Sequence, residues 1–207
     1  MQPVEGGLRE HHKAQRRIRI LEATRRLLRE SPESVLSTER IAERAGVAPA
    51  TVYNLIGPRD KIWEALATEF MDELERRLGE LGNCGPQDVV RSTVQLFVAD
   101  PVVSRRLVRE WEASGLVFAR SPLTQLRRAL ADARSQGLLR ADIDTDGLAT
   151  VVATACVGAL HQWVAALIDD DRFLARALFA LDVALAAAAA DPHREQLLTP
   201  LRDRGTV

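Results

Sequence analysis

The sequence predicts an all-α protein, and three observations lead to this fold class. Most segments place apolar residues at the i, i+3, i+4 spacing of a helix, and no run alternates between apolar and polar residues as a strand does. Short breaks rich in Gly, Pro and Asp separate the segments. The chain of 207 residues, 46% of them hydrophobic, is long enough to bury a substantial core. We expect about nine helices, three in an N-terminal head and the others in a larger C-terminal body.

The first predicted helix covers residues 13 to 30. Its apolar residues share one face, which must pack against other helices: Ile20, Leu21, Leu27 and Leu28. Before this helix, residues 1 to 12 contain the pairs Gly6-Gly7 and His11-His12. We predict that residues 1 to 12 form a flexible basic arm.

Two shorter helices follow, joined by a glycine turn. Ser37 is placed to cap the first of them, and Gly46 supplies the left-handed residue that ends it. Pro49 fits the first position of the second helix, and Gly57-Pro58 ends that helix. Their apolar residues repeat at helical spacing: Ile41, Ala42, Ala45, Val52, Leu55 and Ile56. Two such helices packed on a longer one are the outline of a DNA-binding helix-turn-helix.

Three stretches of this region carry a family resemblance: I-L-E-A-T-R-R-L-L, I-A-E-R-A-G-V and T-V-Y-N-L-I-G-P-R-D-K-I. Over residues 16 to 66 the chain resembles the DNA-binding domain of the tetracycline-repressor (TetR) family of transcription regulators. The resemblance implies that Pro49 to Leu55 form the recognition helix. It also implies that Tyr53 and Arg59 bind phosphates and that Thr51 and Asn54 face the groove.

Three positions depart from the family's usual pattern. Ala48 stands where a capping Ser or Thr is common, Leu55 where a phosphate-facing His often lies, and Ile56 in place of Phe. The exchange at Ile56 keeps the core apolar, whereas the other two remove polar groups. We therefore expect the remaining phosphate ligands and the arm before residue 20 to supply more of the affinity for DNA.

The full set of residues that we predict to contact DNA is Arg17, Ser37, Thr38, Pro49, Ala50, Thr51, Tyr53, Asn54, Arg59 and Lys61. Pro49 and Ala50 offer apolar contact, which fits thymine methyl groups. Asn54 fits the N6/N7 edge of adenine, a contact worth about 1 to 3 kcal/mol of discrimination when bidentate. Two alternatives remain open: Asn54 is a solvated polar residue, and Tyr53 is a packing residue.

Charge is distributed unevenly along the chain. Residues through Lys61 include 12 Lys and Arg against 8 Asp and Glu, whereas the remainder includes 16 against 21. Cationic side chains concentrate in the first helix: Arg9, Lys13, Arg16, Arg17, Arg19, Arg25, Arg26 and Arg29. A solvated helix face gives the same pattern, but beside a helix-turn-helix we favour contact with phosphates.

Beyond the head we predict helices over residues 58 to 81, 87 to 99, 102 to 118, 122 to 136, 145 to 168 and 171 to 190. The predicted domains are an arm over 1 to 12, a DNA-binding domain over 13 to 61, a ligand-binding and dimerisation domain over 62 to 190, and a loosely held tail over 191 to 207.

Residues 147 to 168 contain no Asp, Glu, Lys or Arg and are long enough to span a bilayer. Asp residues rather than Lys or Arg flank both ends, however, which argues against a membrane span. We predict a homodimer interface in this segment and the next helix, formed by Ala153, Val157, Gly158, Phe179 and Leu181. The family resemblance implies that these helices pair with their copies in a four-helix bundle. A buried helix in a monomer is the alternative.

The resemblance also implies a pocket inside the body. The residues that we predict to line it are Phe70, Leu74, Thr93, Phe97, Trp111, Phe118, Cys156 and His161. The expected ligand is a small hydrophobic or aromatic molecule. Ordinary core packing remains an alternative for the aromatic residues and for His161. Arg105, Arg106 and Arg109 fit an anionic effector, although a solvated face paired with Glu110 and Glu112 explains them more simply.

The sequence argues against other classes of function. Cys84 and Cys156 are far apart with no His at ligand spacing, so we expect no metal and no cofactor. No nucleophile elbow, phosphate loop or carboxylate pair indicates an enzyme, and we predict no catalytic residues. No apolar signal segment begins the chain, so a cytoplasmic protein is expected.

We predict a one-component regulator, a homodimeric repressor that binds a palindromic double-stranded operator and is released by a small organic ligand. The alternative is a helical protein-interaction module or a regulator without a small-molecule effector.

Overall fold

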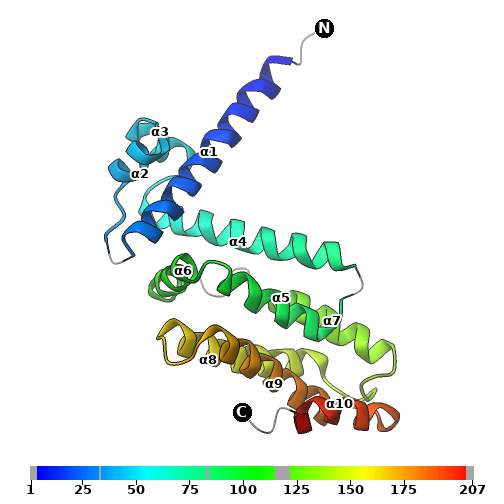
Figure 1. The fold of residues 1–207 in the computed structure, drawn as a ribbon. Helices are drawn as coiled ribbons and strands as arrows, with labels where there is room; N and C mark the ends of the chain where they lie inside the picture. Colours follow the sequence, from blue (N-terminus) through cyan, green and yellow to red (C-terminus); the bar gives the residue numbers. More distant parts are fainter. Residues whose placement is uncertain (1–3, 33, 83, 115–121, 204–207) are drawn as a thin grey trace. The chain divides into compact units, whose positions relative to one another are not determined.

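The computed structural model describes residues 4–32, 34–82, 84–114 and 122–203. Within these ranges it contains ten α-helices and no β-strand, only an isolated bridge between Leu139 and Ala189 (Figure 1). The helices are α1 (Val4–Glu30), α2 (Thr38–Ala45), α3 (Pro49–Leu55), α4 (Arg59–Leu81), α5 (Pro86–Val98), α6 (Pro101–Ser114), α7 (Leu123–Ser135), α8 (Thr145–Val164), α9 (Asp170–Ala188) and α10 (Asp191–Asp203). The predicted all-α fold class is confirmed.

The chain divides into two compact units. The first contains α1, α2, α3, α6 and the part of α4 that ends at Phe70. The second contains the rest of α4, from Met71, together with α5, α7, α8, α9 and α10. One continuous helix, α4, therefore contributes residues to both units.

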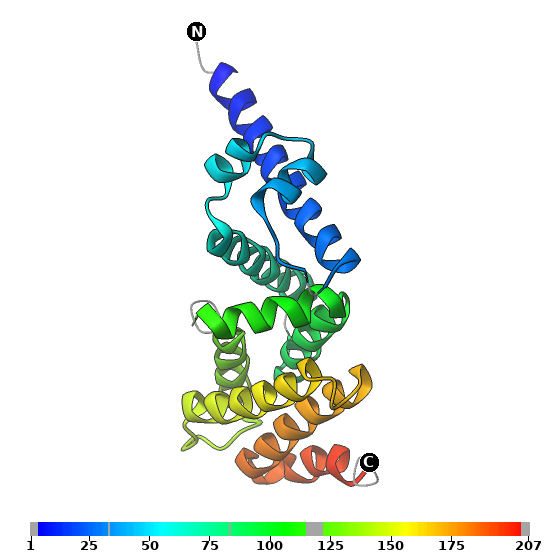
Figure 2. The ribbon, with the colours of Figure 1, turned by 90° about the vertical axis from the view of Figure 1, so that its left-hand side faces the viewer.

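The first unit is built around the apolar face of α1. Ile20, Leu21 and Leu28 are fully buried, as their helical spacing predicts. α2 adds Ile41 and α3 adds Val52, and both side chains are also fully buried in the same cluster. Each such burial stabilises the unit by about 1.5 to 3 kcal/mol. Both short helices consequently lie against α1, an arrangement that is visible in Figure 2.

The second unit has an aromatic cluster at its centre. Trp163 of α8 stacks on Phe173 of α9 with ring centroids 5.4 Å apart, and Phe97 of α5 meets Trp163 at 6.5 Å in an edge-on geometry. The Trp163 indole N–H donates a hydrogen bond of 2.6 Å to the Asp170 carboxylate, so this buried donor is satisfied. The cluster thus holds α5, α8 and α9 together.

Aspartates begin the two long apolar helices of this unit. The Asp144 carboxylate accepts a hydrogen bond from the backbone N–H of Asp146 at 3.0 Å and caps α8. The Asp169 carboxylate accepts one from the backbone N–H of Arg172 at 2.8 Å and caps α9. Each cap satisfies one of the backbone N–H groups that a helix leaves free in its first turn.

Three predicted helix boundaries were wrong. α1 begins at Val4 rather than at residue 13, because two glycines cost a helix only about 1 kcal/mol each and good helix formers follow them. Residues 191 to 203 form α10 instead of a tail; Pro192 lies in its first turn, where no backbone N–H is needed. α8 ends at Val164 rather than at residue 168, because Ala166 adopts the left-handed conformation with φ 58°.

Candidate nucleic-acid interface

A tight turn fixes the angle between α2 and α3. Ser37 caps α2, since its hydroxyl oxygen accepts a hydrogen bond of 3.2 Å from the backbone N–H of Arg40. Gly46 ends the helix with φ 65° and ψ 40°, and the backbone N–H of Val47 donates to the Ala42 carbonyl at 3.0 Å. The left-handed residue costs glycine no steric strain, so the sequence sets this turn locally.

α3 presents one face to solvent. Val52 is fully buried and anchors its inner side, and the half-buried Leu55 and Ile56 pack against the same core. The side chains on the opposite side are exposed: Pro49, Ala50, Tyr53 and Asn54. Tyr53 is the most prominent of these, with 60% of its surface accessible. These four residues, at positions i, i+1, i+4 and i+5, form what we call the outward face of α3.

The other predicted contacts of this region differ in exposure. Thr51 and Thr38 are half-buried, and Ser37 is engaged as the α2 cap. Ala48, at the N-cap of α3, makes no side-chain cap hydrogen bond. Pro49 has no backbone N–H, and that of Thr51 donates to the Ala48 carbonyl at 2.8 Å, so a backbone bond and not a capping side chain holds the first turn of α3.

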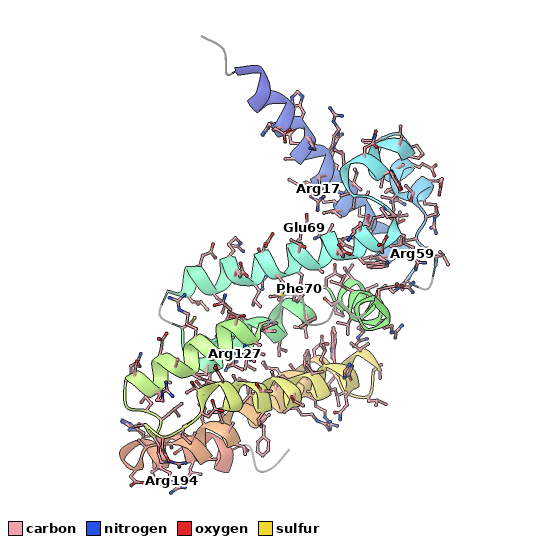
Figure 3. The ribbon with its side chains drawn as sticks, turned by 180° about the vertical axis from the view of Figure 1, so that it is seen from behind. Arg17, Arg59, Glu69, Phe70, Arg127 and Arg194 are labelled. Carbon is pink, nitrogen blue, oxygen red and sulfur yellow. The ribbon has the colours of Figure 1, made fainter. Side chains whose placement is uncertain are left out.

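Arg17 connects α1 to the end of α3. Its Nη1 donates a hydrogen bond of 3.0 Å to the Leu55 carbonyl, one of the last carbonyls of α3. Figure 3 labels Arg17 on α1. Because the terminal carbonyls of a helix lack partners within the helix, this bond helps to hold α3 in place. Sequence reasoning predicted only a DNA contact for Arg17, since 38 residues separate it from Leu55.

Arg59 and Lys61, at the start of α4, already have acidic partners. Arg59 Nη2 lies 3.3 Å from Oε1 of Glu110 on α6, which also lies 2.9 Å from Nη2 of Arg106. Lys61 Nζ donates to both carboxylate oxygens of Glu64 at 2.7 Å, and these bonds raise the pKa of the Lys61 ammonium. A DNA phosphate would therefore compete with carboxylates for both cations.

Comparison with known proteins covers this same region. Residues 20–55 match the family model described as bacterial regulatory proteins, tetR family. The match spans the buried face of α1, the turn at Gly46 and the whole of α3. Over these residues the chain is similar to the tetR family. The first unit thus contains a region that resembles the DNA-binding domain of these regulators, as the sequence predicts.

Solved structures similar to this chain include three informative cases. SmeT, the repressor of the Stenotrophomonas maltophilia multidrug efflux pump SmeDEF, is 25% identical over 84% of this chain and 91% of its own, with a TM-score of 0.59. CprB, a TetR-family protein from S. coelicolor A3(2), is 23% identical over 93% and 98%, with a TM-score of 0.59. A gamma-butyrolactone receptor, an ArpA-like protein, is 23% identical over 93% and 97%, with a TM-score of 0.56. No curated protein matches the chain.

The predicted ligand-contacting residues occupy several environments. Phe70 packs against the core of the first unit. In the second unit, Leu74 is fully buried and Phe97 belongs to the aromatic cluster. The Thr93 hydroxyl is half-buried and donates to the Val89 carbonyl at 2.7 Å. Trp163, the aromatic residue that organises this core, was not in the predicted set.

Two of the remaining predicted ligand contacts, Cys156 and His161, differ in exposure. The Cys156 sulfur lies 3.9 Å from the Ala177 carbonyl, and burial raises the pKa of its thiol to about 11. His161 is exposed. The side chain of Trp111 and the whole of Phe118 lie outside the described residues.

The predicted dimer residues fall on both sides of their helices. Gly158 is exposed, Ala153 and Val157 are half-buried, and Phe179 is 46% accessible. The prediction for Leu181 was wrong, because this side chain is fully buried inside its own unit. Two residues along a helix rotate the side chain by about 200°, so Phe179 and Leu181 point in nearly opposite directions.

Apolar residues lie on the exposed side of α8 and α9, next to the exposed polar residues Thr154, His161 and Arg176. The apolar members are Val151, Ala155, Gly158, Phe179 and Val183, which we call the α8–α9 face. Val151, Ala155 and Val183 were missed from the sequence. In the described part of the chain, α8 is the one helix long and apolar enough to cross a membrane, and only 28% of its apolar window is buried. A surface of this kind must be covered by something apolar.

Proposed function

We propose that this protein is a homodimeric repressor that binds a palindromic operator and leaves it when a small organic ligand binds. The observation that carries the proposal is the outward face of α3. Four adjacent side chains are exposed there on a helix whose other side is anchored in the core by Val52. A helix held in this way can enter the major groove with its side chains toward the base edges.

The chemistry of this face supports a particular operator. Pro49 and Ala50 favour thymine methyl groups, whereas Asn54 favours the adenine edge. We expect the exposed Tyr53 hydroxyl to bind a DNA phosphate. Arg59 should bind a phosphate as well, after it has released the carboxylate of Glu110. We therefore expect A·T pairs under α3 in each half-site.

A second copy is the occupant that we propose for the α8–α9 face. Small residues at Ala155 and Gly158 allow close approach of another helix, and a Cβ added to Gly158 would meet nothing within 4 Å. Symmetric pairing of this face joins two heads, which matches the two-fold symmetry of a palindromic operator. The acidic flanks, with Asp144 and Asp169 as helix caps, disfavour a membrane headgroup surface in the same place.

For the ligand we propose a small hydrophobic or aromatic molecule bound in the second unit near Thr93 and Phe97. The names of two relatives, a repressor of an efflux pump and a gamma-butyrolactone receptor, support a ligand-responsive protein. α4 runs through both units without a break, so it is suited to transmit a change from the ligand site to the head. A coupling of about 1 to 3 kcal/mol changes operator affinity roughly 5- to 150-fold.

Selection of bound duplexes from a random pool tests the proposal. A palindromic consensus with two half-sites about 34 to 36 Å apart, or a multiple of that distance, is the expected result. If binding depended on salt but gave no consensus sequence, the protein would be a non-specific DNA binder. If it bound no duplex at all, a helical protein-interaction module would be the better interpretation. With an operator in hand, a true effector must bind more weakly to the operator complex, by the same factor by which it weakens DNA binding. The proposal assigns no catalysis and locates the protein with DNA in the cytoplasm.

A further inference from the structure

The N-terminal part of α1 extends beyond the rest of the first unit. Figures 1 and 2 both show this segment projecting past α2 and α3 with no helix beside it. Residues 10 to 19 are all exposed, in contrast to the buried face that begins at Ile20. A helix exposed on every side gains nothing from core packing, so the projecting segment must be explained by its surface chemistry.

Basic side chains form a continuous stripe on this segment. Lys13, Arg16 and Arg17 are spaced at i, i+3 and i+4, which places them on one face of the helix. Arg17 fixes where this face points, because it donates to the Leu55 carbonyl at the end of α3. The stripe therefore begins beside the recognition helix and runs away from it along α1.

The stripe is not neutralised within the described residues. Lys13 and Arg16 make no hydrogen bond or ion pair there, and the one bond of Arg17 goes to a neutral carbonyl. Arginines farther along the same helix behave differently, since Arg25 pairs with Glu69 and Arg29 pairs with Asp100. The arginines near the core thus stabilise the first unit, whereas those on the projecting turns stay available to an outside anion.

We propose that this basic stripe, Lys13, Arg16 and Arg17, binds phosphates of the duplex that flanks each half-site. The inference rests on the proposed function and extends it, because α3 alone would read only the half-site. A helix rises 1.5 Å per residue, so Lys13 lies about 6 Å beyond Arg17 along α1. Each base pair advances the duplex by about 3.4 Å, and this distance corresponds to roughly two base pairs.

Duplex DNA fits the segment better than other acidic partners. Between residues 10 and 19 only Ala14 and Ile18 are apolar, so no apolar face exists to insert into a bilayer or an apolar groove. Cations at regular helical spacing match the repeated charge of a phosphate backbone. The segment also starts at the helix that the family match assigns to DNA reading.

The test compares two duplexes that carry the selected operator. One ends at the outer edges of the half-sites, and the other has about eight more base pairs on each side, beyond the roughly two that the stripe spans. We expect the wild type to bind the longer duplex at least about tenfold more tightly, with a steeper dependence of log K on log salt. The double variant Lys13→Gln/Arg16→Gln should lose this preference. Because a dimer loses four cations, its salt slope on the longer duplex should fall by about 3 to 4.

The matched control is Arg128→Gln/Arg194→Gln, which removes the same charge from exposed arginines of the second unit. This control should keep the preference for the longer duplex. Equal affinity of the wild type for both duplexes would overturn the inference while leaving the proposed function intact. So would a Lys13→Gln/Arg16→Gln variant that weakens both duplexes equally, because the stripe would then act within the half-site. A wild type that binds neither duplex would overturn both proposals.

Discussion

The outward face of α3 and the α8–α9 face are built in the same way but carry different chemistry. In each case buried side chains fix one side of a helix, Val52 in α3 and Trp163 in α8, and leave the other side exposed. The outward face of α3 offers the polar groups of Tyr53 and Asn54 and adjoins Arg17 of α1, whereas the α8–α9 face consists of apolar residues. We propose that the core sets the direction of each face and that the exposed residues select its partner, DNA for α3 and a second copy for α8 and α9.

The largest effect should follow from blocking the α8–α9 face. Gly158→Trp places a bulky side chain where a Cβ now meets nothing within 4 Å, so the chain should still fold but its copies should no longer approach. Light scattering should show a monomer. Operator affinity should fall roughly 10²- to 10⁴-fold, because two linked heads bind with the advantage of a high effective concentration.

Gly79→Trp is the matched control for this substitution. Gly79 is also an exposed glycine within a helix, and a Cβ added to it would likewise meet nothing within 4 Å. We expect this variant to remain dimeric and to bind the operator normally. A monomeric wild type at micromolar concentration would contradict the proposed role of the α8–α9 face.

The two sides of α9 can be separated by the pair Leu181→Ala and Phe179→Ala. Both are measured by denaturant unfolding in the monomeric Gly158→Trp background, where dimerisation no longer contributes. Leu181→Ala should lower the free energy of unfolding by about 2 to 5 kcal/mol, since it leaves a cavity in the core. Phe179→Ala should change it by about 0.5 kcal/mol or less, as for other exposed positions. If both substitutions lowered the free energy of unfolding equally, Leu181 and Phe179 would not lie on opposite sides of α9.

The contrast between the faces also explains which parts of the structure the sequence could predict. The helix-turn-helix depends on signals that act within a few residues, the Ser37 cap, the left-handed Gly46 and Pro49 at the first helical position. Such local signals are readable without knowledge of the tertiary fold. The similarity to the tetR family lies in the same short segment.

Features that depend on tertiary packing were less accessible to sequence reasoning. In α9 the exposed Arg172 and Arg176 lie at helical spacing with Phe179 and so indicate the outward side of the helix. Asp182 is also charged but is buried, so charge alone does not show which residues of α9 point inward. The bond from Arg17 to Leu55 and the pair between Arg59 and Glu110 join residues 38 and 51 positions apart. Charge pattern identifies such side chains as basic, but only the fold shows which carbonyl or carboxylate each one meets.

A smaller effect is expected for base reading by α3. Asn54→Ala should reduce discrimination at one base pair of each half-site by about 1 to 3 kcal/mol, because the variant loses a contact to the adenine edge. The measurement is competition between the operator and duplexes altered at single positions. Tyr53→Phe serves as the comparison, since loss of a phosphate contact should weaken all duplexes alike. If Asn54→Ala also weakened every duplex equally, Asn54 would not read a base.

The smallest predicted effect has the opposite sign and concerns the acidic partner of Arg59. Side chains in the Arg59–Glu110 pair are 47% and 22% accessible, so the pair stabilises the free protein only weakly. Glu110→Gln removes the charge that competes with DNA phosphate and should raise affinity for all duplexes about 2- to 5-fold, the range expected for an exposed ion pair. Sequence preference should not change. Fluorescence anisotropy with operator and altered duplexes measures both quantities.

Two comparisons separate release of Arg59 from a general effect of charge. Glu80→Gln removes an equally charged carboxylate that pairs with Arg76 in the second unit, and it should leave affinity for DNA unchanged. In an Arg59→Ala background, Glu110→Gln should lose most of its effect, because the cation that it would release is absent. A full increase in affinity in that background would show that Glu110 repels DNA directly. The affinity of the first unit for DNA would then depend on its overall surface charge and not on competition between Glu110 and phosphate for Arg59.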